Sequence, residues 1–211
     1  MKAPAPTPAN CGLTLPEVLL LVALLSLIAL LMIPGALVKP HPARDRLTKT
    51  LCANNLKAIG TAMQEFGAEH GGRLSPLNFP PTEAPIQTDA FLPRIFESLS
   101  NYSLLPQHLL CPADKAKTGT PPQATITNSN ISYFASLDAT VSVPNALTAG
   151  DRNLRSEEGP LHPGILSLRA NDRLGWTASV HLCGNEPCGN ILLADGHVAT
   201  SVTNQIGRAH V

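Results

Sequence analysis

The stretch Gly12-Leu13-Thr14-Leu15-Pro16-Glu17, with the uncharged apolar residues 18–38 directly after it, shapes the expectation for the whole chain. At a rise of about 1.5 Å per residue, a helix over this run is about as long as a hydrocarbon core of about 30 Å is thick. We therefore expect residues 13–38 to form a transmembrane helix. Glu17 lies directly before the run, and a carboxylate in that place is costly unless it finds a partner, which makes it a functional candidate.

These residues resemble the cleavage and methylation site of type IV prepilins and type II secretion pseudopilins. In that family a Gly is followed by an apolar residue, Thr, Leu, any residue, Glu and a long apolar run. The resemblance implies that prepilin peptidase cleaves after Gly12, removes residues 1–12 as a leader peptide and methylates the new amino terminus at Leu13. It also implies that Glu17 acts in assembly with other pilin or pseudopilin subunits.

One residue departs from this pattern. The family most often has Phe or Met where this chain has Leu13. An ordinary signal anchor and a lipoprotein-like leader at Cys11 are the alternatives; we disfavour the second because the apolar run follows Cys11 instead of preceding it.

The resemblance places the protein in the bacterial inner membrane as a single-pass protein, with its C-terminal domain outside the cytoplasm and available for a filament at the cell surface. The charges disagree with this orientation. Only Lys2 precedes the apolar run, whereas Lys39, Arg44, Arg46 and Lys49 follow it, and the positive-inside rule alone would reverse the topology. We give the motif more weight than the charges.

Composition leaves room for one modest domain after the anchor. The chain has 211 residues, of which 44% are hydrophobic, and 15 basic side chains balance 15 acidic ones. Nucleic acid is therefore not an expected partner, because phosphate binding needs a concentrated basic patch. The 20 prolines and 15 glycines predict many turns. We expect no cofactor.

A second helix is predicted within residues 39–72, from a stripe of residues at helical spacing that ends before Gly71-Gly72. The stripe consists of Leu47, Leu51, Asn55 or Leu56, Ile59, Met63 and Phe66. Residues 52–60 resemble a branch of pilin-like proteins in which a long N-terminal helix packs on a C-terminal antiparallel sheet. The predicted fold is therefore α+β and pilin-like, with residues 73–211 as a globular extracytoplasmic domain.

Within that domain we expect a short helix over 90–99, strands over 131–137, 165–168 and 176–182, and a hairpin over 190–198. Asp195-Gly196 occupies the expected hairpin turn. This end of the chain resembles the processing-associated element named for a His, nine residues and Asp-Gly. The candidate His181 precedes Asp195 by a longer spacing, with Cys183 and Cys188 in the added residues.

The cysteines suggest disulfides. Cys11 would be lost with the leader, which leaves four and hence three possible connectivities. We favour Cys52 with Cys111, which would tie the helix to the domain, and Cys183 with Cys188, which would close a short loop. The competing interpretation is a zinc site formed by Cys183, Cys188, His181 and His197.

The sequence offers no recognised catalytic motif, so we expect no enzyme. Glu157-Glu158 is expected in a solvated loop, and His162 and His197 at the surface. Asp195 is expected to shape a turn. The alternative role for Asp195 is to bind calcium, helped by the nearby oxygen donors Asn185, Glu186 and Asn190.

These observations predict a non-enzymatic pilin-like or pseudopilin subunit that is processed by prepilin peptidase. Its partners would be that peptidase, other subunits and the membrane, in a type II secretion or type IV pilus-like filament. The alternative is a membrane-anchored extracytoplasmic module that binds a sugar or peptide.

Overall fold

The computed structural model describes residues 14–37, 42–77, 91–119, 125–156, 159–160 and 173–202. The chain divides into two compact units, Met1–His41 and Pro42–Val211. Several predictions lie outside the described residues: the leader with Cys11, the cleavage site at Gly12 and Leu13, the strand at 165–168, and the residues Glu157, Glu158 and His162.

In the first unit, helix α1 spans Leu15–Leu37. A membrane span needs about 20 consecutive apolar residues in one helix. In the ranges given above, no helix has both the length and the apolar character that crossing a membrane requires. The predicted transmembrane helix over 13–38 is therefore wrong, as is the single-pass placement in the bacterial inner membrane with an extracytoplasmic domain. That prediction relied on the apolar composition of residues 18–38, which does not by itself establish a spanning helix.

In the second unit, helix α2 spans Pro42–Glu69 and begins with a proline, whose fixed φ suits the first helical position. Its buried face begins at Cys52 and continues through Leu56, Ile59, Met63 and Phe66. Leu47 and Leu51, which the predicted stripe included, are 59% and 42% exposed. After the helix, Gly71 and Gly72 have φ of 66° and 83°, which suits the glycines expected to end it.

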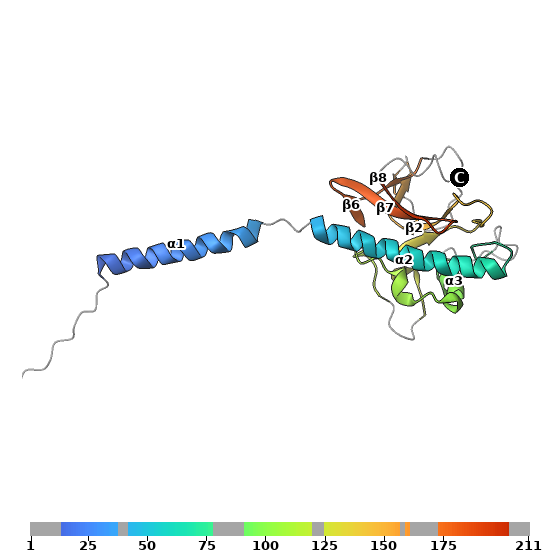
Figure 1. Cartoon of the computed structure of the whole chain (residues 1–211), viewed down its shortest axis with the longest axis horizontal. Helices are drawn as coiled ribbons and strands as arrows, with labels where there is room; N and C mark the ends of the chain where they lie inside the picture. The colour runs from blue at the N-terminus through green and yellow to red at the C-terminus, as the bar shows by residue number, and fades with distance from the viewer. Residues whose placement is uncertain are drawn as a thin grey trace, which may run out of the picture. The chain divides into compact units, whose positions relative to one another are not determined.

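The second unit is α+β, with an antiparallel sheet of five strands in the order β1-β2-β7-β6, and β8 paired with β7. The strands are β1 Tyr133–Ala135, β2 Leu147–Asp151, β6 His181–Cys183, β7 Glu186–Leu193 and β8 Val198–Val202. Strand β7 is central: it pairs with β2, β6 and β8. Figure 1 shows α2 running along this sheet with α3, Phe91–Leu99, beside it.

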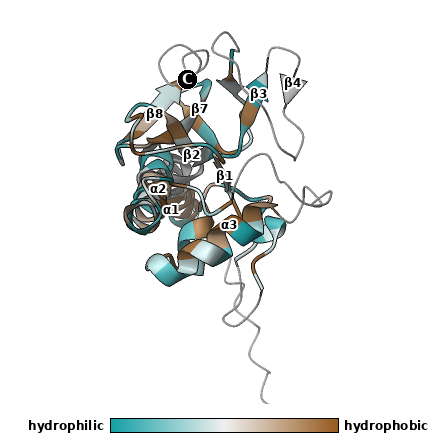
Figure 2. Ribbon diagram, turned by 90° about the vertical axis from the view of Figure 1, so that its right-hand side faces the viewer, coloured by the Kyte–Doolittle hydropathy of each residue, from teal (hydrophilic) through white to brown (hydrophobic). Residues whose placement is uncertain are grey.

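The two faces of β7 enter two different cores because successive side chains of a strand point in opposite directions. Leu192 packs in the larger core, which α2 and α3 cover, whereas Ile191 and Leu193 pack around Trp176. Gly60 lets α2 approach β7 closely, since a Cβ there would lie 2.9 Å from Leu192 Cδ1. In Figure 2, α3 carries both hydrophobic and hydrophilic residues, as an amphipathic helix does.

A smaller sheet has the order β4-β3-β5 and lies at the Trp176 side of the unit. Its strands are β3 Leu154–Ser156, β4 Gly159–Pro160 and β5 Gly175–Trp176. Three short 3-10 helices complete the described elements: η2 Ser100–Tyr102, η3 Pro106–Leu109 and η4 Asn128–Asn130.

The strand predictions differ from the structure in detail. The strand expected at 131–137 is shorter, and the one expected at 176–182 is divided between β5 and β6 by a turn. The hairpin of β7 and β8 does turn at Asp195-Gly196, but only Gly196 has a positive φ, of 86°. Leu193 accepts a hydrogen bond from Gly196 N and donates one to His197 O, which describes a three-residue loop with a glycine bulge and not a two-residue turn.

Candidate functional site

The N-terminus of α1 places Glu17 in a local hydrogen-bond arrangement. Its Oε2 accepts bonds of 2.8 Å from the backbone N–H and from the hydroxyl of Thr14. Thr14 precedes the helix and Glu17 is its third residue, the spacing at which a Thr and a Glu cap a helix start. The bond from the Thr14 backbone, followed by that from its hydroxyl, lowers the pKa of Glu17. Sequence reasoning marked Glu17 but missed that its own chain supplies a partner.

The side chains of residues 15–29, the part of α1 whose burial the structure describes, are uncovered within their unit. Every residue from 15 to 29 is exposed, with Leu15 at 77%, Leu20 at 73% and Val22 at 57%. The exposed residues occupy consecutive positions and so surround the helix. A helix that is apolar on all sides requires a covering partner, because apolar surface is unfavourable in water.

The structure contains both disulfides that the sequence favoured. Cys52 on α2 is bonded to Cys111, just after η3, and both cysteines are buried. Cys183 is bonded to Cys188 across the β6–β7 hairpin. The first bond links segments 59 residues apart and the second segments 5 residues apart, so the first is the cross-link that ties α2 to the rest of the unit.

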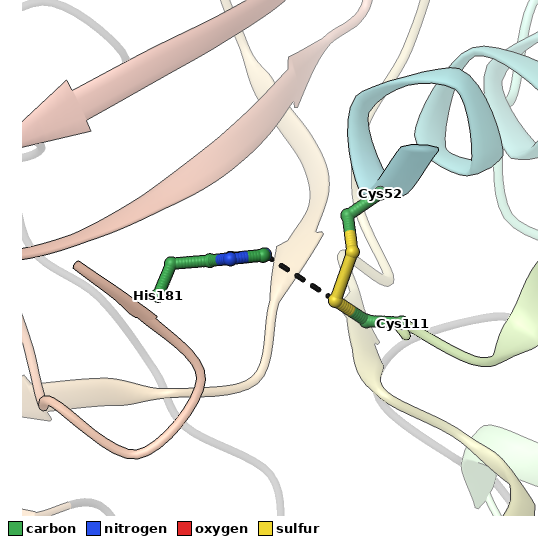
Figure 3. Close-up of side chains that lie close together, drawn as sticks. All are labelled: Cys52, Cys111 and His181. Carbon is green, nitrogen blue, oxygen red and sulfur yellow. Dashed lines mark hydrogen bonds between the residues drawn. A yellow bond between two sulfur atoms is a disulfide. The ribbon is translucent and has the colours of Figure 1, made fainter. Parts of the chain in front are cut away.

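A buried cluster surrounds the first disulfide. His181 on β6 points its imidazole at the sulfur of Cys111, as Figure 3 shows, with Nε2 3.3 Å from Sγ. The same Nε2 lies 3.5 Å from Oδ2 of Asp151, at the end of β2. His181 is 3% exposed and Asp151 is 0% exposed. We call Cys52, Cys111, His181 and Asp151 the buried cluster.

The surroundings of Asp151 hold its carboxylate in place. Its Oδ2 accepts hydrogen bonds from the backbone N–H and side-chain amide of Asn190, at 2.7 and 3.0 Å. Asn190 in turn accepts a bond of 2.8 Å from the Thr200 hydroxyl. Oδ1 of Asp151 is buried and has no hydrogen-bond partner among the described residues.

Burial determines the protonation of this pair. It raises the pKa of Asp151 to about 7, although the hydrogen bonds from Asn190 oppose the rise. It lowers the pKa of His181 to about 4, and the positive charge of Lys49 adds to that effect. Both shifts favour the neutral forms of the carboxyl group and the imidazole.

Tyr133 and Asn55 close the α2 side of the cluster. The Asn55 amide donates a hydrogen bond of 2.9 Å to the carbonyl of Leu110 and one of 3.3 Å to the Tyr133 hydroxyl. Burial, and then the nearby charge of Asp151, raises the pKa of Tyr133. Asn55 is therefore a polar linker between α2 and the Cys111 segment, whereas the predicted stripe left open whether Asn55 or Leu56 is in the core.

An ion pair lies beside this region. The Arg152 guanidinium binds the Asp114 carboxylate through two hydrogen bonds, of 2.5 Å from Nε and 2.7 Å from one terminal nitrogen. The Asp114 side chain is fully buried and that of Arg152 is 32% exposed. Burial raises the pKa of Asp114, but the bonds and charge of Arg152 outweigh it and the pKa lies below its ordinary value. Sequence reasoning missed this pair because its members are far apart in the chain.

The two metal alternatives from the sequence are not assembled. The His181 imidazole contacts Cys111, whereas His181 meets Cys188 only as its cross-strand partner in the β6–β7 pairing, and His197 is exposed. Asp195 Oδ1 accepts a bond from His197 N, which is the expected turn role. Asn190, proposed as a calcium ligand, is buried against Asp151. In the part of the chain that the structure describes, the one group of three His, Cys, Asp or Glu donors suited to a metal is Cys52, Cys111 and His181.

Comparison with known proteins adds no neighbour: neither a family model nor a curated protein nor a solved structure matches this chain. The prepilin resemblance therefore remains a prediction from the residues that carry it.

Proposed function

We propose that the protein is a non-enzymatic pilin-like or pseudopilin subunit, cut by prepilin peptidase after Gly12 and assembled in a type II secretion or type IV pilus-like filament. The observation that carries the proposal is the uncovered apolar surface of α1, directly after the residues that resemble a prepilin cleavage site. Contiguous exposed apolar surface of this extent marks an interaction site. In the proposed filament, α1 helices of neighbouring copies cover one another.

The second unit supports the proposal as the part that a filament would display. Its α2 packs on an antiparallel sheet, and two disulfides cross-link it. One pocket, lined by residues that include Asp45 and His181, has a volume of about 110 Å³. This pocket is below the usual size of a small-molecule site, about 300–1,000 Å³, and does not itself support the sugar- or peptide-binding alternative.

Glu17 has two possible roles, and a pair of variants separates them. If its carboxylate meets the positive amino terminus of a neighbouring subunit, losing the charge leaves that amine without a partner in the filament and weakens assembly. If it only caps α1, the charge is dispensable. Glu17→Gln keeps an oxygen that can accept the Thr14 hydrogen bonds but removes the charge, whereas Glu17→Ala removes both.

We expect both variants to be processed to the same N-methylated Leu13 terminus, as mass spectrometry would report. We expect both to fail in assembly, followed by sedimentation and electron microscopy of the mature protein. A Glu17→Gln variant that assembles like the wild type would assign Glu17 to capping alone. A mature wild-type protein that stays monomeric, or one that keeps residues 1–12 in its native cell, would refute the proposed function.

A further inference from the structure

The buried cluster brings together donor atoms that zinc-class cations prefer, from four separate segments of the second unit. The ligand atoms of Cys52, Cys111 and His181 all lie within 4.8 Å of one another. Asp151 lies outside that group of three, but its Oδ2 is 3.5 Å from His181 Nε2. After reduction, two thiolates and an imidazole, with the Asp151 carboxylate moving in as the fourth ligand, would form a four-coordinate set that suits Zn²⁺.

The distances around His181 fit such a site. Bond lengths of about 2.3 Å to sulfur, 2.05 Å to nitrogen and 2.1 Å to oxygen place N and S about 3.6 Å apart, and N and O about 3.4 Å apart, in a tetrahedral zinc centre. The corresponding distances here are 3.3 Å from Nε2 to Cys111 Sγ and 3.5 Å from Nε2 to Asp151 Oδ2. The imidazole and carboxylate therefore need little movement to share one cation.

The carboxylate of Asp151 has the support and the free capacity of a ligand. Asn190 orients it through two hydrogen bonds to Oδ2, the kind of outer contact that holds metal ligands in place. Its buried Oδ1 has no hydrogen-bond partner within the described ranges. A buried oxygen without a partner is costly, and a cation bound to this carboxylate would offset that cost, although the oxygen nearest His181 is Oδ2.

We propose that, when the Cys52–Cys111 disulfide is reduced, Cys52, Cys111, His181 and Asp151 bind one zinc-class divalent cation. The disulfide and the metal centre are then alternative cross-links of the same two segments, chosen by redox conditions. This inference does not depend on filament assembly.

The chemistry balances with a dithiol or phosphine as the reductant. The disulfide accepts two electrons from it and two protons from water, which yields two thiols. Cation binding then releases both thiol protons to solvent, and any proton on Asp151. His181 binds through Nε2 and carries its single proton on Nδ1. A small pocket lined by Asp45, Thr48, Ala113 and His181 gives solvent an approach to the cluster.

The second disulfide is an internal control. Cys183 and Cys188 form a second disulfide-bonded cysteine pair, but among the described residues they belong to no group of three His, Cys, Asp or Glu donors within 4.8 Å of one another. We therefore expect no metal at that pair after reduction.

The test uses the full chain, reduced with a phosphine under anaerobic conditions and titrated with Co²⁺, a spectroscopic substitute for Zn²⁺. We expect one Co²⁺ per chain, with a thiolate charge-transfer band and the strong visible absorption of tetrahedral cobalt, both lost on adding Zn²⁺. The oxidised protein should bind none. The Cys183→Ser/Cys188→Ser variant should bind as the wild type does. His181→Asn, once circular dichroism and a thiol assay have shown its fold and disulfide before reduction, should bind at least tenfold more weakly.

Three results would overturn the proposal. These are no thiolate band with the reduced wild type, a band that survives in Cys52→Ser/Cys111→Ser, and unchanged affinity in His181→Asn. Circular dichroism shows whether the reduced chain is still folded. If reduction unfolds the chain, one equivalent of Zn²⁺ should restore the spectrum of the folded protein. A spectrum that stays unfolded would also refute the site.

Discussion

Replacing the Cys52–Cys111 disulfide by two alanines should destabilise the protein about twice as much as the same change at Cys183–Cys188. A cross-link removes entropy from the unfolded chain in proportion to the logarithm of the loop it closes. For loops of 59 and 5 residues the chain-entropy relation yields about 4 and about 2 kcal/mol at 25 °C. Small domains are stable by about 5–15 kcal/mol, so the first loss takes a large share of the total.

Burial adds to the difference in stability loss between the two double variants. Cys52 and Cys111 are 0% and 1% exposed, so alanine at both positions also leaves unfilled volume beneath α2. Cys188 is also 0% exposed, but Cys183 lies at the partly exposed tip of the hairpin, so only one of the two alanines there leaves unfilled volume. The packing term therefore acts in the same direction as the loop term.

Urea unfolding followed by circular dichroism measures both losses, with each double variant compared with the oxidised wild type. The dependence of the unfolding free energy on urea concentration should become steeper, and more so for the Cys52→Ala/Cys111→Ala variant, because its unfolded chain expands further. Equal losses, or a larger loss at Cys183 and Cys188, would refute the argument from loop length and burial.

Two further predictions concern contacts within the second unit. Arg152→Ala should cost about 2 to 3 kcal/mol, less than for a fully buried pair because Arg152 is 32% exposed. The pKa of Asp114 is lowered in the folded protein, so the wild type should keep this stabilisation above about pH 4 and lose it as the pH falls through the lowered pKa. The Arg152→Ala variant should lack this acid-dependent loss. Identical pH profiles of the unfolding free energy in the two proteins would contradict the pairing. Gly189→Ala should destabilise by about 1 to 3 kcal/mol and alter tryptophan fluorescence, because its Cβ would lie 2.5 Å from the Trp176 ring. Gly119→Ala is the matched control, since the nearest atom to its Cβ would be 3.9 Å away, and equal thermal stability of the two variants would refute the packing argument.

Local patterns in the sequence were sufficient for the elements that depend on neighbouring residues. The three- and four-residue spacing of Leu56, Ile59 and Met63 predicted the buried face of α2, and the glycine pair after it predicted its end. Helical periodicity is a property of one segment, so one segment reveals it. The same reasoning went wrong at residues 13–38, where apolar composition was taken as a membrane span.

The buried cluster was beyond sequence reasoning. The competing zinc interpretation grouped His181 with Cys183 and Cys188, its neighbours in the chain, whereas β6 places its imidazole against Cys111 and Asp151. That placement follows from the order β1-β2-β7-β6, in which β7 pairs with both β2 and β6.

The sequence by itself therefore determined the helical stripe of α2, the turn at Asp195-Gly196 and the cysteines available for pairing, because each depends on residue type and short spacing. Only the tertiary structure decided which titratable groups meet. The distance from His181 to Asp151 depends on strand order and register, and these are settled by the packing of the whole unit and not by any one segment.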